Sequence, residues 1–333
     1  MKVLVIGGTG LISVGIVKHL LARKAEVHVF NRAQRESTLP GSEICHVGDR
    51  QDISKLSGLA QLNFDVVIDM ICFSPEQANA TIHSFANKCE HLIFCSTVCT
   101  YGSKFAKHVL IEEDFPQEPI SGYGQGKLEC ERLFLKAHDD GKFAVTVIRP
   151  SHTYGPGSPL IDQLEFNPTS WDRIEKALPV LCAGDGLGLW QSTHRDDVGK
   201  LFAYASLNKT TYGECYNATR DSTFCWKDYY RDVATALDCQ AQLVFMPTWW
   251  IVKQDPQRFE LLNSITQYHG AYSSSRAKRD VPKFICEVDL VSGAKDTLRS
   301  SKDRGVFLDS SKDLQYQDII NEALAFGAEV KGI

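Results

Sequence analysis

Hydroxyl and amino groups stand at two places in the sequence where they could move a proton together. Thr97 follows the apolar run at residues 91–95, and Tyr123 precedes Lys127 by four positions, so both side chains share one helix face. A free tyrosine has a pKa of roughly 10, too high for a base at neutral pH, but a nearby ammonium favours the phenolate. We therefore expect Tyr123 to act as acid and base beside the Thr97 hydroxyl. Taken alone, this pattern also fits an ordinary exposed helix face.

A glycine-rich turn near the start of the chain predicts a site for a phosphate-bearing ligand. The apolar run at residues 3–6 meets Gly7-Gly8-Thr9-Gly10, and a helical pattern follows. Gly7 permits a tight turn, Gly10 lets the backbone approach a pyrophosphate, and N–H groups at the helix start receive the anion. Ser13 replaces a third glycine, and because Ser is small we expect only a slight loss of helix–strand closeness. The alternative is a turn that only joins two elements. The predicted dinucleotide-binding residues here are Gly7, Thr9, Gly10, Leu11 and Ile12.

The end of the second predicted strand bears on which dinucleotide binds. Asn31 and Arg32 stand where an enzyme for the unphosphorylated cofactor usually carries Asp or Glu, and Arg35 follows one helical turn later. A carboxylate would repel a 2′-phosphate, whereas a guanidinium binds it with paired, charge-assisted hydrogen bonds. We therefore predict that Asn31, Arg32 and Arg35 favour NADP(H). The alternative is a solvated Arg32 and NAD as the cofactor.

The first half of the chain contains elements that could bring these residues together. Short runs rich in Val and Ile alternate with helical patterns, as strands covered on both faces do. The expected strands are residues 3–6, 26–30, 43–47, 66–68, 91–95 and 144–148, and the expected helices are 11–23, 75–87 and 127–137. The alternation predicts an α/β fold with a doubly wound parallel sheet, the Rossmann fold.

The pattern changes after Pro150, where Pro and Gly cluster at residues 155–159 and Gly recurs at 184–188. We expect residues 1–156 plus about 190–222 to form the dinucleotide-binding domain. Residues 157–189 plus 223–333, which carry many bulky aromatic side chains, would form a smaller C-terminal substrate lobe. A ligand would lie between this lobe and the carboxyl edge of the sheet.

Composition excludes several classes of protein. The 333 residues are 43% hydrophobic and 23% charged, as in ordinary globular chains, and their net charge of −5 predicts no nucleic-acid or anionic-membrane partner. The eleven cysteines include no Cys-x-x-Cys pair, so we expect free thiols in a reducing cytosol and no metal site. No secretory signal and no apolar run of roughly 18 residues is visible, which predicts a cytoplasmic protein without a membrane span.

Together these features resemble the extended short-chain dehydrogenase/reductase superfamily, and within it the NAD-dependent epimerase/dehydratase family. Similar motifs continue at residues 149–156, 194–198 and 275–280. The resemblance implies that Tyr123 is the acid and base, that Lys127 binds the nicotinamide ribose and tunes Tyr123, and that Thr97 replaces the usual serine. It also implies that Asp49 contacts the adenine amino group, with Arg50 beside it in the cofactor site. Hydride would move between nicotinamide C4 and a carbinol or carbonyl carbon.

Departures from the family pattern narrow the reaction. Val98-Cys99 replace the Asp-Glu of dehydratases, so dehydration is disfavoured. Trp190 replaces an Arg, and His152 an Asn, that bind the diphosphate in nucleotide-sugar epimerases, which weakens the case for that substrate. Trp190 would stack on a flat ligand or pack in the core, and His152 would touch substrate or be a packed histidine. Cys99 would move a proton, as in fucose-synthase-type relatives, or be a buried thiol.

The sequence therefore predicts an NAD(P)-dependent oxidoreductase or epimerase that acts on a secondary alcohol or ketone of a sugar-like or nucleotide-sugar substrate. One alternative is a one-way NADPH-dependent reductase of a non-nucleotide ketone. Another is a non-catalytic dinucleotide-binding regulator or RNA-associated scaffold. The resemblance also implies a homodimer, formed partly through the helix that carries Tyr123 and Lys127.

Overall fold

The computed structural model describes residues 1–34, 39, 41–103, 108–114 and 117–333, which form two compact units. Unit 1 comprises residues 1–153, 195–221 and 272–287, and unit 2 comprises 154–194, 222–271 and 288–333. Residues 272–287 belong to unit 1, whereas the sequence pattern assigned them to the second lobe. The physical reason is that Ala277, Val281 and Phe284 are buried in the hydrophobic core of unit 1.

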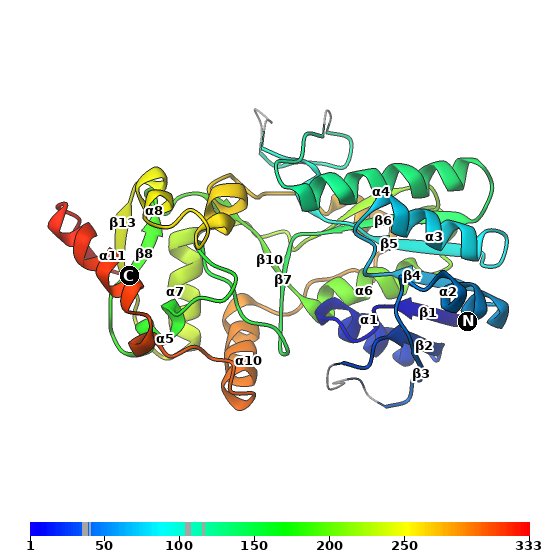
Figure 1. Cartoon of the computed structure of the whole chain (residues 1–333), viewed down its shortest axis with the longest axis horizontal. Helices are drawn as coiled ribbons and strands as arrows, with labels where there is room; N and C mark the ends of the chain where they lie inside the picture. The colour runs from blue at the N-terminus through cyan, green and yellow to red at the C-terminus, as the bar shows by residue number, and fades with distance from the viewer. Residues whose placement is uncertain (35–38, 40, 104–107, 115–116) are drawn as a thin grey trace. The chain divides into compact units, whose positions relative to one another are not determined.

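A seven-stranded sheet in the order β11-β6-β5-β4-β1-β2-β3 forms the centre of unit 1, and every strand pair is parallel (Figure 1). The order reverses between β1 and β4, and at such a switch point the carboxyl ends of the strands border a ligand crevice. This sheet confirms the predicted doubly wound α/β fold. Its strands are β1 (Lys2–Ile6), β2 (Glu26–Asn31), β3 (Ile44–Val47), β4 (Val66–Asp69), β5 (His91–Cys95), β6 (Ala144–Pro150) and β11 (Cys215–Ala218).

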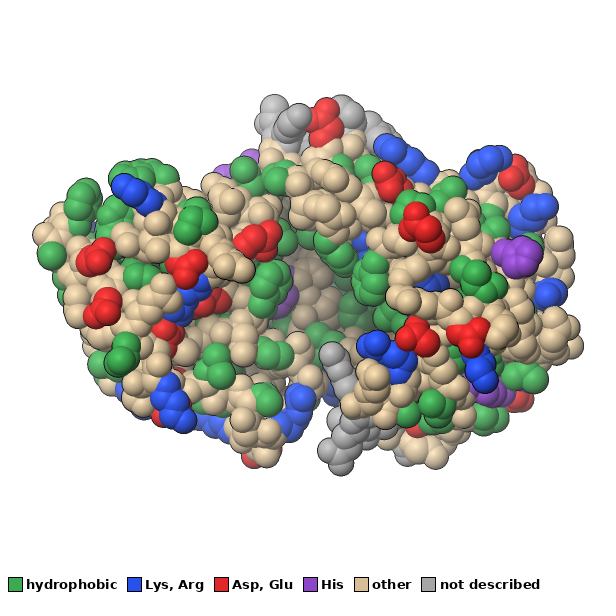
Figure 2. Space-filling view, in the orientation of Figure 1, with side chains coloured by type: hydrophobic (Ala, Val, Ile, Leu, Met, Phe, Trp, Pro, Cys, Tyr) green, Lys and Arg blue, Asp and Glu red, His purple; other side chains and the backbone are tan. Residues whose placement is uncertain are grey.

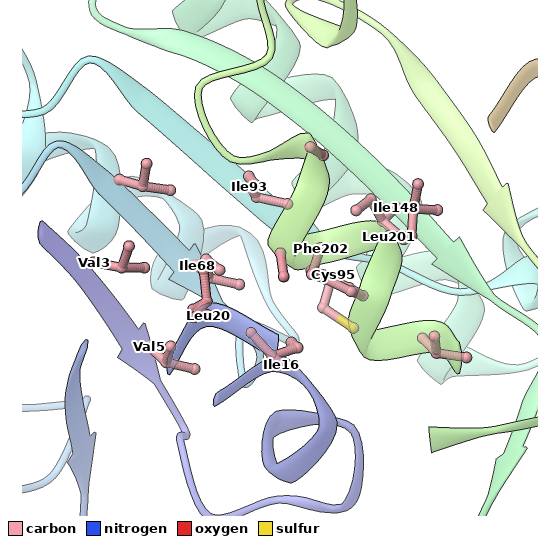
Figure 3. Packing of buried hydrophobic residues seen from close by; sticks show 14 of the residues in the cluster. Val3, Val5, Ile16, Leu20, Ile68, Ile93, Cys95, Ile148, Leu201 and Phe202 are labelled. Atoms are coloured by element: carbon pink, nitrogen blue, oxygen red, sulfur yellow. The ribbon is translucent and has the colours of Figure 1, made fainter. Parts of the chain in front are cut away.

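Helices cover both faces of this sheet because its strands are apolar on both sides. Val3 and Val5 pack on one face against α1 and α6 (Figure 3). Leu4 and Ile6 pack on the other face against α2, α3 and α4. Full burial of one such side chain contributes about 1.5–3 kcal/mol, so the alternation fixes which face each helix covers. The helices of unit 1 are α1 (Leu11–Ala22), α2 (Ile53–Leu59), α3 (Pro75–Phe85), α4 (Gly122–Asp139), α6 (Arg195–Ala205) and α9 (Ser275–Asp280).

Two glycines let α1 and α6 approach closely. A Cβ atom added to Gly15 would lie 2.4 Å from the carbonyl oxygen of Arg195, and one added to Gly199 would lie 2.4 Å from the carbonyl carbon of Gly15. Both distances are far below van der Waals contact, so neither position has room for a side chain. The pair α1–α6 therefore depends on glycine at both positions.

Unit 2 has its own cores and a small sheet in the order β14-β13-β8. All five tryptophans of the chain belong to it; Trp226 is fully buried, whereas Trp249 is 63% exposed. Its helices are α5 (Ser170–Glu175), α7 (Trp226–Ala236), α8 (Thr248–Gln254), α10 (Leu290–Asp303) and α11 (Leu314–Ala325). Its strands are β8 (Val180–Ala183), β9 (Leu189–Trp190), β10 (Ser192–His194), β12 (Phe224–Cys225), β13 (Gln242–Met246) and β14 (Val330–Gly332). Strand β7 (His152–Tyr154) begins in unit 1 and ends at the first residue of unit 2.

The surface carries charges of both signs. On the face shown in Figure 2, Lys and Arg side chains are interspersed with Asp and Glu side chains. Within the described ranges, no helix has the length and apolar character needed to cross a bilayer.

Candidate active site

The glycine turn between β1 and α1 is held by its own hydrogen bonds. The Gly7 amide donates to the carbonyl oxygen of Phe30 at 2.8 Å, and the Ser13 hydroxyl donates to the carbonyl oxygen of Gly7 at 2.8 Å. Gly7 has a φ of +85°, and a Cβ atom there would lie 2.6 Å from Ile71 Cγ2. Glycine is thus required at position 7, and the Ser13 side chain stabilises the turn instead of loosening it.

A first cavity, of about 320 Å³, lies beside this turn; we call it cavity A. The ends of β2 and β3 contribute to it, because parallel strands place their carboxyl ends at one edge of the sheet. Asp49 is exposed there, and its Oδ1 accepts a hydrogen bond from the Gln51 amide at 2.9 Å. Arg35 lies outside the described residues. The sequence-predicted residues that line cavity A are Gly7, Thr9, Gly10, Asn31, Arg32, Asp49 and Arg50.

Arg50 has a second role in the same region. Its guanidinium is only 6% exposed, and Nη2 donates to Asp69 Oδ2 at 2.9 Å and to Thr81 Oγ1 at 2.8 Å. The Thr81 hydroxyl also donates to Asp69 Oδ2, at 2.8 Å. A buried charge needs such partners, because without them desolvation costs several kcal/mol. Arg50 therefore ties the loop after β3 to β4 and α3 and also lines cavity A.

A second cavity, of about 290 Å³, is cavity B, and it brings the three candidate catalytic side chains together. Thr97 follows β5, whereas Tyr123 and Lys127 occupy the first two turns of α4. Leu11 and Ile12, from the start of α1, line the same cavity. The predicted catalytic residues and the predicted cofactor turn thus border one space.

Local hydrogen bonds fix where α4 begins and how it meets the end of β5. Ser121 caps the helix, since its hydroxyl accepts from the Gly124 amide at 3.1 Å. A Cβ atom at Gly124 would lie 2.6 Å from the carbonyl oxygen of Cys99, so glycine permits this close packing. As a result Tyr123, in the first turn, borders cavity B with 48% of its surface exposed.

Lys127 is almost fully enclosed, with an exposed fraction of 1%. Its ammonium donates to the carbonyl oxygen of Cys95 at 2.7 Å and lies 4.5 Å and 4.9 Å from the ring centroids of Phe73 and Phe94. Aromatic faces attract a cation most strongly where water is excluded. Within the described ranges no carboxylate pairs with this ammonium, so a carbonyl and aromatic faces hold its charge.

Although 48% of the Tyr123 surface is exposed, its hydroxyl end is enclosed, and this burial raises the pKa of Tyr123 above its ordinary value of 10. The Cys95 and Cys99 thiols add to the rise, and the Thr97 side chain opposes it. The chain's own groups therefore hold this pKa above its ordinary value, and the lowering expected from Lys127 does not prevail. The Lys127 ammonium lies 5.9 Å from the Tyr123 ring centroid and donates to Cys95 instead. In this arrangement the phenol is protonated at neutral pH.

Sequence reasoning did not include two apolar side chains that line both cavities, Ile71 and Phe73. Phe73 is 47% exposed, and its ring centroid lies 6.3 Å from that of Tyr123. Both residues follow β4, which ends at the switch point of the sheet. Their position after a strand at that point is the sequence signal that could have identified them.

None of the three candidate substrate residues is among the described residues that line cavity B. Burial raises the pKa of the Cys99 thiol, and burial lowers the pKa of His152 to about 3, so both side chains are neutral at physiological pH. Trp190, in unit 2, is 7% exposed and stacks on Trp226 with ring centroids 4.7 Å apart. These environments favour a buried thiol for Cys99, a packed histidine for His152 and core packing for Trp190. In the described part of the chain, no group of three metal-ligating side chains is arranged to hold an ion.

Comparison with known proteins identifies the family. The model of the family described as NAD dependent epimerase/dehydratase matches residues 3–218. The chain is 27% identical to a 2′-dehydrokanamycin reductase of Streptomyces kanamyceticus over 255 residues, 76% of this chain and 72% of that protein. It is 27% identical to the chloroplast stem-loop binding protein of 41 kDa b of Arabidopsis thaliana over 328 residues, 92% of this chain and 80% of that protein.

A solved structure shows the same fold at lower sequence identity. The UDP-glucuronic acid 4-epimerase of Bacillus cereus, in complex with UDP-glucuronic acid and NAD, superposes with a TM-score of 0.70 and 19% identity. The superposition covers 91% of this chain and 100% of that one. Because the family model matches residues 3–218, which is more than half of the chain, the chain belongs to the NAD-dependent epimerase/dehydratase family.

Proposed function

We propose that this protein is an NAD(P)-dependent oxidoreductase or epimerase that transfers hydride at a secondary alcohol or ketone of a sugar-like substrate. The observation that carries the proposal is cavity B, where Thr97, Tyr123 and Lys127 border the same space as the glycine turn. A hydroxyl, a phenol and an ammonium around one cavity suit proton transfer to and from a substrate oxygen.

The residues beside the glycine turn fit a dinucleotide. Gly7 and Gly10 border both cavities, and no side chain of the described residues caps the first turn of α1, so its N–H groups can receive a pyrophosphate. Asn31, Arg32 and Asp49, in cavity A, would hold the adenosine half. When bound, the cofactor supplies the hydride donor and acceptor at its nicotinamide ring.

Each catalytic side chain has a separate task in this proposal. The Thr97 hydroxyl donates a hydrogen bond to the substrate oxygen and orients it. The Tyr123 phenol gives a proton to that oxygen during reduction and takes it back during oxidation. Lys127 binds the ribose hydroxyls next to the nicotinamide, and its charge stabilises the phenolate whenever the proton has left Tyr123.

We further propose that the preferred cofactor is NADP(H). Arg32 is exposed at cavity A. The neighbouring Asn31 is neutral, and its Oδ1 accepts a hydrogen bond from the Ala33 amide at 2.7 Å. A guanidinium without an adjacent carboxylate at the end of β2 favours a 2′-phosphate over a free hydroxyl.

A one-way NADPH-dependent ketone reductase is a second candidate. The likeness to a 2′-dehydrokanamycin reductase supports this direction. An epimerase would reoxidise its cofactor within each turnover and show no net consumption of it, whereas a reductase would consume NADPH in proportion to product.

The test is a panel of free and nucleotide-linked sugars and their keto derivatives, assayed for loss of NADPH absorbance and for epimerised product. Tyr123→Phe should abolish turnover and leave the dissociation constant of NADPH, measured by calorimetry, unchanged. Turnover that persists in Tyr123→Phe would refute the catalytic assignment. Sustained NADPH consumption would refute the epimerase form, and epimerisation without net consumption would refute the reductase form.

A further inference from the structure

A buried ion pair between α4 and β6 lies outside the linings of cavities A and B. Glu131 and Arg149 are 1% and 3% exposed. Arg149 Nε donates to Glu131 Oε1 at 2.9 Å, and Nη2 donates to Oε2 at 2.6 Å, so the pair is bidentate. Two opposite charges are thus locked in one geometry in the interior of unit 1.

The Glu131–Arg149 pair contacts the segment of residues 96–101, which includes Thr97, at both ends of that segment. The Ser96 hydroxyl donates to Glu131 Oε1. Arg149 Nη1 donates to the Tyr101 hydroxyl at 3.1 Å, and that hydroxyl donates to Asn217 Oδ1 at 2.9 Å. Thr97 lies between Ser96 and Tyr101, so contacts on either side of it lead back to the same ion pair.

The pair also adds a second contact between α4 and the end of β5, one helical turn after the contact that Lys127 makes. Lys127 donates to the carbonyl oxygen of Cys95, and Glu131, one turn further along α4, accepts from Ser96, the next residue after β5. Helix α4 is therefore joined to the end of β5 at two successive turns. Tyr123 lies one turn before Lys127 on the same helix, so this double attachment sets the Tyr123 phenol and the Thr97 hydroxyl at a fixed relative position.

Stability alone does not account for such a pair. Desolvation of two buried charges offsets much of their attraction, and replacement by well-packed apolar residues is often neutral or stabilising. Catalysis, in contrast, is sensitive to small displacements of reacting groups. We propose that Glu131 and Arg149 are positioning residues that align Thr97 with Tyr123 and Lys127, a role that rests on the function proposed above for those three side chains.

The first test removes the two charges together, so that none is left buried alone. The double variant Glu131→Leu/Arg149→Met should fold, bind NADPH with an unchanged dissociation constant and lose about 10²-fold in kcat on the substrate that the panel identifies. A kcat equal to that of the wild type would overturn the proposal. If the double variant does not fold, the single variants described below provide the kcat comparison.

A second readout needs no substrate. The ultraviolet absorbance of tyrosinate is titrated against pH with NADP⁺ bound and free, and the Tyr123→Phe curve is subtracted to isolate Tyr123. Among the described residues, the titratable groups around the phenol are Cys95, Cys99 and Lys127. Bound NADP⁺ should lower the titration midpoint in the wild type and should lower it less in the double variant.

The two proposals fail in different ways in this titration. A wild-type midpoint that NADP⁺ leaves unchanged would contradict the role of Tyr123. A midpoint that NADP⁺ lowers equally in the wild type and the double variant would contradict the positioning role alone.

Unit 2 offers a matched control in the pair of Glu165 and Arg258. Arg258 Nε donates to Glu165 Oε1 at 2.7 Å, and Nη2 donates to Oε2 at 3.1 Å, so this pair is bidentate as well. Glu131→Gln and Glu165→Gln each remove one carboxylate from a bidentate contact with Arg, although Arg258 also donates to Asp313 Oδ2 at 2.6 Å and so keeps a partner. Both should lower the midpoint of thermal unfolding, and only Glu131→Gln should lower kcat. Equal effects of the two variants on kcat, or no effect of Glu131→Gln, would overturn the proposal.

Discussion

The protonation state of Tyr123 decides which direction of proton transfer is easier at neutral pH. Its pKa is raised by burial, so the folded chain presents a phenol and not a phenolate to cavity B. A phenol can protonate the oxygen of a ketone as hydride arrives, but it must first lose its proton before it can accept one from an alcohol. In the mechanism proposed above, this phenol is ready to protonate a ketone oxygen, whereas oxidation requires that it first lose its proton.

The first prediction concerns this pH dependence. The rate of reduction should stay constant through neutral pH and fall only in the alkaline range, where the phenol loses its proton. The rate of oxidation should rise with pH, because it requires the phenolate. Initial rates of NADPH loss and of NADPH formation, measured with one ketone and its alcohol, test the pH dependence of reduction and of oxidation. An oxidation rate that does not change up to strongly alkaline pH would contradict the role of Tyr123.

The second prediction concerns cofactor choice. Arg32→Ala should weaken NADPH binding by about 10- to 100-fold, because a hydrogen bond to a charged group contributes about 1.5–3 kcal/mol, and should leave NADH binding unchanged. Calorimetric titration with each cofactor measures both values. Lys136→Ala provides the control, since that side chain is 70% exposed on α4 and does not line cavity A. Equal losses for both cofactors in Arg32→Ala would contradict the prediction.

The sequence could predict where single residues lie along the predicted elements, but not how each side chain is buried. The positions of Thr97, Tyr123 and Lys127 follow from a strand end and one helical spacing, and cavity B includes all three. The environments of Cys99 and His152 depend on which distant segments cover them, and neighbours along the chain do not encode that. The same holds for the pKa of Tyr123, which depends on burial and on the thiols and the Thr97 side chain around it.

The contact between α1 and α6 links the glycine turn to a helix about 180 residues later in the sequence, because Gly15 and Gly199 leave no space between the two backbones. Since α1 begins at the turn, any shift of this helix also moves the N–H groups at its start. The conformation of the dinucleotide site thus depends on close packing between two elements far apart in the sequence.

The third prediction tests this packing. Gly15→Ala should lower the free energy of unfolding by at least about 1–3 kcal/mol, since a methyl group there would overlap the Arg195 carbonyl. Gly58→Ala, in α2, is the matched control, because a Cβ atom there meets nothing within 4 Å. That variant should stabilise the protein by about 0.4–1 kcal/mol. Urea unfolding followed by circular dichroism measures the free energy of unfolding of both variants. An unchanged free energy of unfolding in Gly15→Ala would contradict the prediction.

The spacing of apolar residues predicted those elements of unit 1 whose pattern is visible in the neighbouring sequence. Strands β1–β6 lie within two residues of the predicted limits, and α1 and α3 begin at the predicted residues, whereas α4 begins at Gly122, five residues before the predicted start. Strand β11 was not predicted, because four residues without a clear pattern become a strand only through pairing with β6. Residues 272–287 carry no local sign that their apolar side chains join the core of unit 1.

Buried histidines connect the pH of the solution to the stability of the whole protein. His91 is fully buried in β5, and its Nε2 contacts Thr146 Oγ1 at 2.8 Å while its Nδ1 accepts from the Leu207 amide at 3.2 Å. Burial lowers the pKa of His91 from 6.5 to about 3. The unfolded chain therefore binds a proton at mildly acidic pH that the folded chain excludes.

The fourth prediction follows from this difference. The stability that neutral His91 contributes is complete above pH 6.5 and is lost as the pH falls toward 3. At pH 5 the loss from this residue should be about 2 kcal/mol. His91→Gln should make the unfolding free energy less dependent on pH between 7 and 5. His83→Gln, at an exposed position of α3, should leave that dependence as in the wild type; an identical dependence in both variants would contradict the prediction.

The distribution of tryptophan has a practical consequence for studies of the intact molecule. All five indoles belong to unit 2, so intrinsic fluorescence reports on that unit, and the unit with the glycine turn is silent by this method. An aqueous quencher such as acrylamide would reach Trp249 first, while Trp226 is protected. A melting curve recorded from indole emission would therefore not register a variant that loosens only the glycine turn.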